Sequence, residues 1–157
     1  HDLNILSEHG LKFKRILVGC DFSEDSNLAF QHGLSLAQEF QSELHLVHVM
    51  EPLVYMDTFK ISTGYGEEHQ VDLQIQIKDK LKKMVPTEAF NWCKPQTVLL
   101  DGPSHEELIR YAKTNKMDLI VLGIRGQGLV ERLFIGSTTD RVVRQTSCPV
   151  LSVCLPE

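Results

Sequence analysis

Residues 118–123 read Asp-Leu-Ile-Val-Leu-Gly, a short and continuous apolar run with a polar residue before it and a glycine-rich loop after it. Such a run is typical of a strand that is buried on both faces of a parallel sheet. The stretch Arg-Ile-Leu-Val-Gly-Cys-Asp at 15–21 has the same character and predicts the first strand. Both stretches therefore predict buried strands of one sheet.

Helical patterns alternate with further strand-like runs along the rest of the chain. Apolar residues recur at helical spacing after Ser23, which can cap that helix, and Pro86 ends an amphipathic helix over 71–85. Two capping boxes predict the starts of two more helices, Ser104 with Glu107 and Ser137 with Asp140. The remaining strands are predicted at Glu43–Met50, Gln96–Leu100 and Val150–Cys154.

This alternation predicts an α/β fold, an open five-stranded parallel sheet with helices on both faces and right-handed crossovers. The chain has 157 residues, of which 42% are hydrophobic, and this suits one domain whose core needs no disulfide or metal. We expect that domain at 13–157 after an N-terminal extension at 1–12, whose first residue, His1, is consistent with the remnant of a purification tag. Prolines and glycines interrupt the pattern over 51–69 and predict a flexible excursion there.

The charge balance excludes several classes of protein. Lysine and arginine together number 16 against 21 aspartates and glutamates, and the net charge of -5 has the wrong sign for a general binder of nucleic acid or of an anionic membrane. No stretch approaches the roughly 18 apolar residues of a membrane helix, and the start of the chain has no signal-peptide pattern. We therefore expect a cytoplasmic protein. Its four cysteines lack the spacing of a zinc site and are expected to be reduced and mostly packed.

The loop after the fourth predicted strand has the pattern of a phosphate-binding loop. It follows the spacing G-x2-G-x9-G-S-T, with Gly123 and Gly126 at its start and Gly136, Ser137 and Thr138 where the last helix begins. Glycine lets the backbone approach a ligand closely, and a helix start offers N–H groups at the positive end of its dipole. Four arginines against two acidic residues make this segment locally positive. The alternative is that the glycines only turn the chain and that Ser137 caps its own helix.

These motifs are similar to those of the universal stress protein family. The likeness extends from Lys14 to Val153 and has four landmarks in order. They are Ile-Leu-Val-Gly-Cys-Asp-Phe-Ser at 16–23, His-Val at 48–49, the strand 118–123 with its loop, and Cys-Pro-Val-Leu at 148–151. The resemblance implies the strand order 3-2-1-4-5, a homodimer that pairs through the last strand and a cytoplasmic role in the stress response.

One branch of that family binds ATP through the G-x2-G-x9-G-[ST] loop, and this chain retains every position of the loop. The resemblance implies that loop residues hold the triphosphate and that Asp21 accepts hydrogen bonds from the ribose hydroxyls. It also implies that Cys20, Val49 and Leu122 line the adenine pocket. A carboxylate at the end of a strand suits a sugar diol, although helix capping is the alternative role of Asp21. The chain departs from the family at Cys20, where Val or Thr is common, and at Phe22, where Gly is common. The residues assigned to the nucleotide are Cys20, Asp21, Val49, Leu122, Gly123, Arg125, Gly126, Gly136, Ser137, Thr138 and Thr139.

The main hypothesis is a nucleotide-dependent stress-response regulator that binds ATP, with Mg2+ between the phosphates. No obvious general base or pair of metal-activating carboxylates accompanies the loop, so hydrolysis is expected to be slow or absent. The alternatives are a nucleotide-independent dimeric interaction module of the same fold and a slow ATPase. A Walker loop and a dinucleotide fingerprint are excluded because their defining residues are missing. His45 and His48 lie three apart on a predicted strand, so they point to opposite faces and cannot share a metal.

Overall fold

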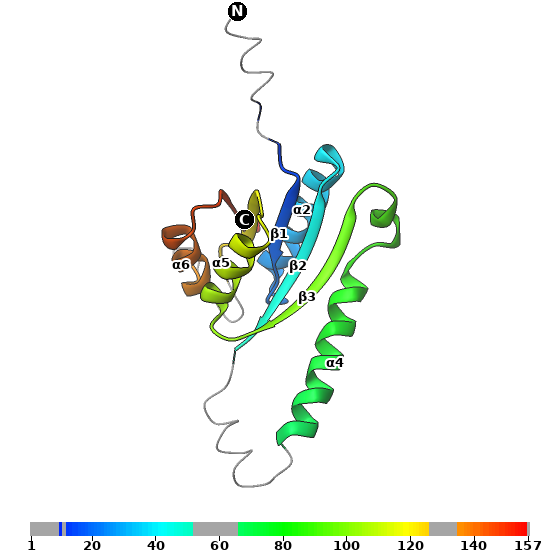
Figure 1. Ribbon diagram of the computed structural model, residues 1–157, viewed down its shortest axis with the longest axis vertical. Coiled ribbons are helices and arrows are strands. Elements are labelled where there is room, and N and C mark those ends of the chain that lie inside the picture. The colour runs from blue at the N-terminus through cyan, green and yellow to red at the C-terminus, as the bar shows by residue number, and fades with distance from the viewer. Residues whose placement is uncertain (1–9, 11, 52–65, 126–134, 157) are drawn as a thin grey trace, which may run out of the picture.

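A computed structural model of the chain describes residue 10 and residues 12–51, 66–125 and 135–156, so most of the predicted N-terminal extension lies outside the described residues. The described elements are β1 (Arg15–Gly19), α2 (Glu24–Phe40), β2 (Glu43–Met50), α4 (Gly66–Met84), η1 (Thr87–Asn91), β3 (Lys94–Asp101), α5 (Ser104–Thr114), β4 (Leu119–Gly123), α6 (Ser137–Gln145) and β5 (Val150–Val153). The five strands form one parallel sheet in the order β3-β2-β1-β4-β5 (Figure 1). The predicted fold class and strand order are confirmed.

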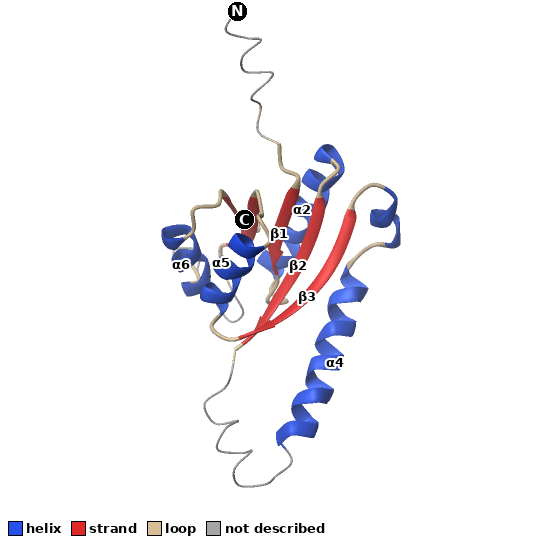
Figure 2. Cartoon of the chain, in the orientation of Figure 1, coloured by secondary structure: helices blue, strands red, loops and turns tan. Residues whose placement is uncertain are grey.

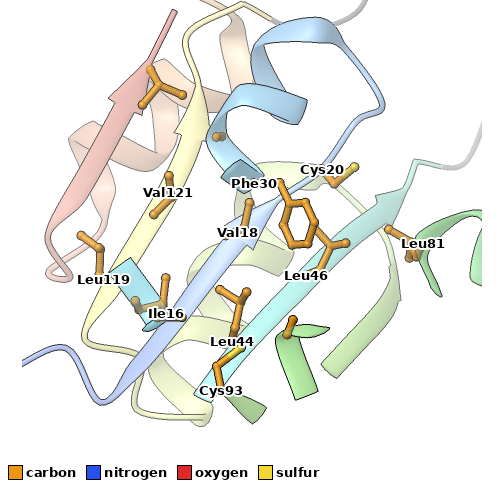
Figure 3. Close-up of a cluster of buried hydrophobic side chains, with 14 residues drawn as sticks. Ile16, Val18, Cys20, Phe30, Leu44, Leu46, Leu81, Cys93, Leu119 and Val121 are labelled. Atoms are coloured by element: carbon orange, nitrogen blue, oxygen red, sulfur yellow. The ribbon is translucent and has the colours of Figure 1, made fainter. Parts of the chain in front are cut away.

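Helices cover both faces of this sheet (Figure 2). α2 and α4 lie on one face, where Val18 and Leu46 of the sheet share a buried cluster with Phe30 of α2 (Figure 3). α5 and α6 pack against each other on the opposite face, over a second cluster that contains Leu17 and Val47. Fully burying one large aliphatic side chain contributes about 1.5–3 kcal/mol, so these two clusters supply the main driving force for folding.

The first crossover shows how local sequence sets the fold. The hydroxyl oxygen of Ser23 accepts a hydrogen bond from the N–H of Ser26, which confirms Ser23 as the N-cap of α2. The helix ends before Gln41, whose φ of 54° lies in the left-handed region. A Cβ on Gly33 would come within 2.5 Å of Cγ2 of Val18, so a side chain here would push α2 away from β1.

Several predicted boundaries differ from the structure; the last strand, for example, is predicted over 150–154 and ends at Val153. The strand predicted over 15–21 ends at Gly19, where its ladder with β2 ends. The strand predicted over 96–100 is longer at both ends, because β3 pairs with β2 along all eight residues. α4 begins at Gly66, so the last part of the predicted excursion over 51–69 is helical, while residues 52–65 lie outside the described residues.

The two predicted capping boxes are wrong. The N-cap residue of α5 is Pro103 and that of α6 is Gly136, and neither has a side-chain hydrogen bond to its helix. Ser104 and Ser137 are instead the first helical residues, one position too late for a capping hydroxyl. The N–H groups at both helix starts therefore need other partners.

Two of the four cysteines belong to the hydrophobic core. All four cysteines are free thiols, with Cys20 and Cys93 buried, and burial raises the pKa of both. Within the described ranges, no helix combines the length and the apolar character that crossing a bilayer requires.

Candidate functional site

A cavity of about 530 Å³ opens at the carboxyl ends of β1, β2 and β4. This volume lies in the range of small-molecule sites, about 300–1,000 Å³. β1 pairs with β2 on one side and with β4 on the other, so the strand order reverses at this point. Ligands of open α/β sheets bind at such a reversal, beyond the carboxyl ends of the strands.

The cavity brings together the residues that the sequence assigned to a nucleotide. Its lining includes Cys20, Asp21, Val49, Leu122, Gly123, Arg125, Gly136, Ser137, Thr138 and Thr139. Gly126 lies outside the described residues. The lining also contains residues that the motif does not predict, among them Ser26, His48, Glu51, Ile77, Ser104 and Leu108. Ser26, Ile77 and Leu108 lie on three helices, α2, α4 and α5. At such positions the sequence pattern predicts a helix face that packs on the sheet, and it does not indicate a binding site.

The start of α6 forms a polar wall of the cavity. The N–H of Gly136 donates to the carbonyl of Ile124 at 2.7 Å, and the hydroxyl of Thr139 donates to the carbonyl of Gly123 at 2.7 Å. These two hydrogen bonds fix the helix start against the end of β4. Ser137 does not cap the helix, so the alternative in which it does is wrong. Since the first N–H groups of a helix have no partner within the helix, this wall is suited to an anion.

The start of α5, which also borders the cavity, already holds a carboxylate. Glu51 follows β2 directly, and its Oε1 accepts a hydrogen bond of 3.0 Å from the N–H of Ser104. Hydrogen bonds from the backbone and hydroxyl of Ser104 hold the pKa of Glu51 below its usual value, and the charge of Arg141 adds to this effect. Of the two helix starts, α6 is therefore the one suited to an anion from outside.

Arg125 lines the cavity, but its guanidinium is bound by Asp25. Nε donates to Oδ2 at 2.9 Å and Nη2 donates to Oδ1 at 3.0 Å, while the N–H of Arg125 donates to Oδ2 at 3.1 Å. Asp25 is only 3% exposed, and the side-chain hydrogen bonds from Arg125 hold its pKa below the usual value. No sequence pattern predicts this pair, because an acid in the first turn of a helix is commonplace.

Asp25 also explains why residue 123 is glycine. A Cβ on Gly123 would come within 2.7 Å of the backbone carbon of Asp25 and 2.8 Å of the nitrogen of Ser26. The loop motif predicts glycine at 123 for the close approach of a ligand. The structure adds the close approach of α2, so the fold itself requires glycine here.

Asp21 and Phe22 form the turn between β1 and α2. Oδ1 of Asp21 accepts hydrogen bonds from the N–H of Ser23, at 3.0 Å, and from its hydroxyl, so Asp21 stabilises the start of α2. Phe22 has a φ of 63°, a conformation that costs of order 1–3 kcal/mol for a non-glycine residue. Its ring lies 4.8 Å from that of His48, and Nζ of Lys80 lies 4.1 Å from its centroid, contacts that offset the strain.

The two histidines of β2 lie in separate environments, as predicted. Nδ1 of His48 lies 2.6 Å from the carbonyl oxygen of Cys20, which can only accept, so Nδ1 carries the proton. On the other face, Nδ1 of His45 lies 2.6 Å from Oη of Tyr111 and Nε2 lies 3.3 Å from Glu43. Burial lowers the pKa of His45 despite this carboxylate. Within the described residues, no group of three His, Cys, Asp or Glu side chains could hold a metal ion.

Comparison with known proteins finds relatives along nearly the whole chain. The family model described as the universal stress protein family matches residues 12–153. Universal stress protein MJ0531 of Methanocaldococcus jannaschii is 34% identical over 152 residues, which cover 92% of this chain and 84% of that protein.

Solved structures share the same architecture. The structure of protein MJ0577, from the same organism, matches with a TM-score of 0.79 and 25% identity over 92% of this chain and 98% of that one. The universal stress protein from Archaeoglobus fulgidus, solved in complex with dAMP, matches with a TM-score of 0.63 over 91% of this chain and 98% of that one. At 16% identity this second likeness shows the fold alone.

Proposed function

The chain belongs to the universal stress protein family, and from this membership and its cavity we propose that it binds ATP and acts as a nucleotide-dependent regulator of the stress response. The observation that carries the proposal is the start of α6. It borders the cavity at the reversal of strand order, and its N-cap, Gly136, offers no side chain to the helix N–H groups.

The triphosphate is proposed to bind at the first turn of α6. The donors are the backbone N–H groups of Ser137, Thr138 and Thr139 and the hydroxyls of the first two, since the hydroxyl of Thr139 already donates to the sheet. Gly123, Arg125, Gly126 and Gly136 complete the proposed loop. A hydrogen bond to a charged group contributes about 1.5–3 kcal/mol. A few of them support micromolar binding, about -8 kcal/mol, after the cost of association.

The adenosine is proposed to bind between the ends of β1 and β2. Asp21 would accept from the ribose hydroxyls, and the backbone of Val49 would contact the base. Leu122 and the thiol of Cys20, whose pKa is raised by burial, provide an apolar lining. The A. fulgidus protein of the same fold was solved in complex with dAMP, and an adenine nucleotide is the class of ligand proposed for this cavity.

Mg2+ is proposed to bind between the phosphate oxygens, where it would neutralise part of their charge. In the described residues, carboxylates around the proposed phosphate site are already engaged: Asp140 by Arg144, Glu51 by Ser104 and Asp25 by Arg125. A carboxylate held in this way is a poor general base, so turnover is expected to be slow or absent.

The last strand is the proposed homodimer contact. β5 lies at one end of the sheet and pairs with β4 alone among the described strands. An edge strand with partly exposed apolar residues is a ready template for pairing with a second copy. We propose a cytoplasmic homodimer with a protein partner that reads the nucleotide state.

Calorimetry with ATP and Mg2+ tests the nucleotide proposal. Thr138→Glu adds a carboxylate to the first turn of α6, which favours the helix dipole but repels phosphates. We expect this variant to fold and to bind ATP at least about tenfold more weakly than the wild type, the equivalent of losing one charge-assisted hydrogen bond. Thr87→Glu makes the same charge change at an exposed position in η1 and should bind like the wild type.

The outcome also separates the candidate functions. ATP binding that weakens at least about tenfold in Thr138→Glu and is unchanged in Thr87→Glu supports the proposal. Absence of any heat or thermal shift at millimolar ATP would instead leave the nucleotide-independent interaction module. Phosphate release that tracks ATP binding would identify a slow ATPase.

A further inference from the structure

Asp25 joins three segments that lie far apart in the sequence. Its Oδ2 accepts from the N–H and Nε of Arg125, and its Oδ1 accepts from Nη2 of Arg125 and, at 3.2 Å, from the N–H of Leu155. Arg125 lies two residues after β4, and Leu155 lies two residues after β5. One carboxylate in the first turn of α2 therefore holds the loop beside the cavity and the segment that follows the last strand.

These contacts behave as a unit because the carboxylate is buried. The side chain of Asp25 is 3% exposed and that of Arg125 is 12% exposed, so water solvates and screens these two charges only weakly. Removing one partner from a buried ion pair leaves an uncompensated charge and is strongly destabilising. Gly123, two residues before Arg125, also packs directly on Asp25. Motion of the Arg125 backbone away from α2 would break several of these contacts together.

The two partners of Asp25, Arg125 and Leu155, lie at different places in the molecule. Arg125 lines the cavity, whereas Leu155 continues from β5 at the edge of the sheet. Nη2 of Arg125 and the N–H of Leu155 share the single atom Oδ1. A restriction on the guanidinium therefore restricts the acceptor of the Leu155 hydrogen bond directly.

We propose that Asp25 is a positioning residue that couples occupancy of the cavity to the order of the segment after β5. The nucleotide part of this inference rests on the function proposed above. A ligand that orders Arg125 stabilises the orientation of the Asp25 carboxylate, and with it the hydrogen bond from Leu155. Because coupling between sites is reciprocal, a fixed C-terminal segment strengthens nucleotide binding by the same factor.

Amide hydrogen exchange at Leu155, resolved by NMR in the full chain, tests this coupling. In the wild type, saturating ATP with Mg2+ should slow the exchange of this amide about fivefold or more, the lower range of known couplings. Asp25→Asn keeps the shape of the side chain but replaces one acceptor by a donor. In this variant Leu155 should exchange faster without ATP, and ATP should no longer slow it.

Asp140→Asn is the matched control. Asp140 lies on α6 beside the proposed phosphate site and pairs with Arg144 at 3.0 Å, so the same charge is removed without touching Asp25. This control should keep the ATP-dependent slowing at Leu155. If Asp25→Asn keeps that slowing as well, the proposed coupling is wrong.

A second variant serves if Asp25→Asn does not fold. Leu155→Pro removes the N–H donor and keeps both members of the Asp25–Arg125 pair in the sequence, and Leu155→Ala, which keeps the N–H, controls for the lost side chain. Reciprocity then predicts that ATP binds this variant more weakly by the factor by which ATP slowed Leu155 exchange in the wild type. Unchanged affinity in Leu155→Pro overturns the inference. A wild type that binds no ATP overturns the proposed function, whereas one that binds ATP with unchanged exchange at Leu155 overturns only the coupling.

Discussion

The carboxylate of Glu51 accepts a hydrogen bond from the backbone N–H of Ser104, so the residue that follows β2 occupies the start of α5. This hydrogen bond distinguishes the two helix starts that border the cavity. At α5 the protein supplies its own anion, and at α6 it does not cap the helix with an N-cap side chain. The arrangement leaves α6 as the start that suits the proposed phosphate site.

Glu51→Gln should lower stability at neutral pH by about 0.3–1 kcal/mol, the typical value of an exposed acid at a helix start. The pKa of Glu51 is lowered in the folded state, so its contribution is present above the usual carboxyl pKa and is lost as the pH falls through the lowered value. Thermal unfolding at pH 7 and pH 3 checks this. A difference in Tm that persists unchanged at pH 3 would contradict the assignment.

Asp21→Ala should weaken ATP binding by roughly ten- to a hundredfold, since a hydrogen bond to a charged group contributes about 1.5–3 kcal/mol. The substitution also removes the acceptor for Ser23, so the free energy of unfolding must be measured beside the affinity. Comparing ATP with 2′-deoxy-ATP isolates the ribose contact. The wild type should prefer ATP and the variant should not; an equal preference in both would show that Asp21 only stabilises α2.

Stability should fall as the pH is lowered through about 6.5 toward the lowered pKa of His45. The unfolded chain takes up a proton in this range, whereas burial keeps His45 neutral in the fold, so the unfolded state binds more protons. His45→Gln should remove this part of the pH dependence. Tyr111→Phe, which deletes only the hydroxyl partner, should lower stability at every pH and retain the slope. Urea unfolding at pH 8, 7, 6 and 5 measures all three proteins.

Gly123→Ala should destabilise the fold by about 1–3 kcal/mol, the usual cost of inserting a methyl group where there is no room. Its Cβ would lie 2.7 Å from the backbone of α2, which cannot move aside as a side chain can. Ser137→Ala is the control in the same motif, because this exposed hydroxyl does not cap α6 and its loss should change stability by less than about 0.5 kcal/mol. Chemical unfolding without ligand compares the two. Equal stabilities would indicate that β4 does not pack on α2 as described.

Ser152→Lys should weaken the proposed dimer at least about tenfold. Ser152 is partly exposed on β5, opposite Leu122 of β4, and an edge lysine is a common device against strand pairing. Sedimentation velocity over a range of concentrations measures the effect, with Thr87→Lys in η1 as a control for the added charge. A wild type that stays monomeric at high concentration would exclude pairing through β5.

Much of the architecture could be predicted because it depends on local patterns. The buried strands β1 and β4 are continuous apolar runs, and α2 has both a helical stripe and a capping serine. The boundaries of β3 could not be read in this way, since its exposed ends are strand only because β2 lies beside them. The predicted capping boxes are wrong for a related reason. Ser104 and Ser137 have an acidic residue three positions later, as a capping box requires, but each helix begins one residue earlier than the box predicts, so both serines are helical.

The candidate site shows the same division. The motif brought its described members to one cavity because the strands that carry them end at the same edge of the sheet. The pair of Asp25 with Arg125 joins residues 100 positions apart, and no spacing rule connects them. Glycine at 123 was anticipated, but one of its reasons, the packing of α2, became visible only in three dimensions.

The polar cluster of Glu43, His45 and Tyr111 lies near the amino ends of the strands, whereas the cavity opens at their carboxyl ends. The sheet thus places its acid-sensitive cluster and its cavity at opposite ends of one domain. Substitutions in the cluster should therefore change how stability depends on pH without changing the residues that line the cavity.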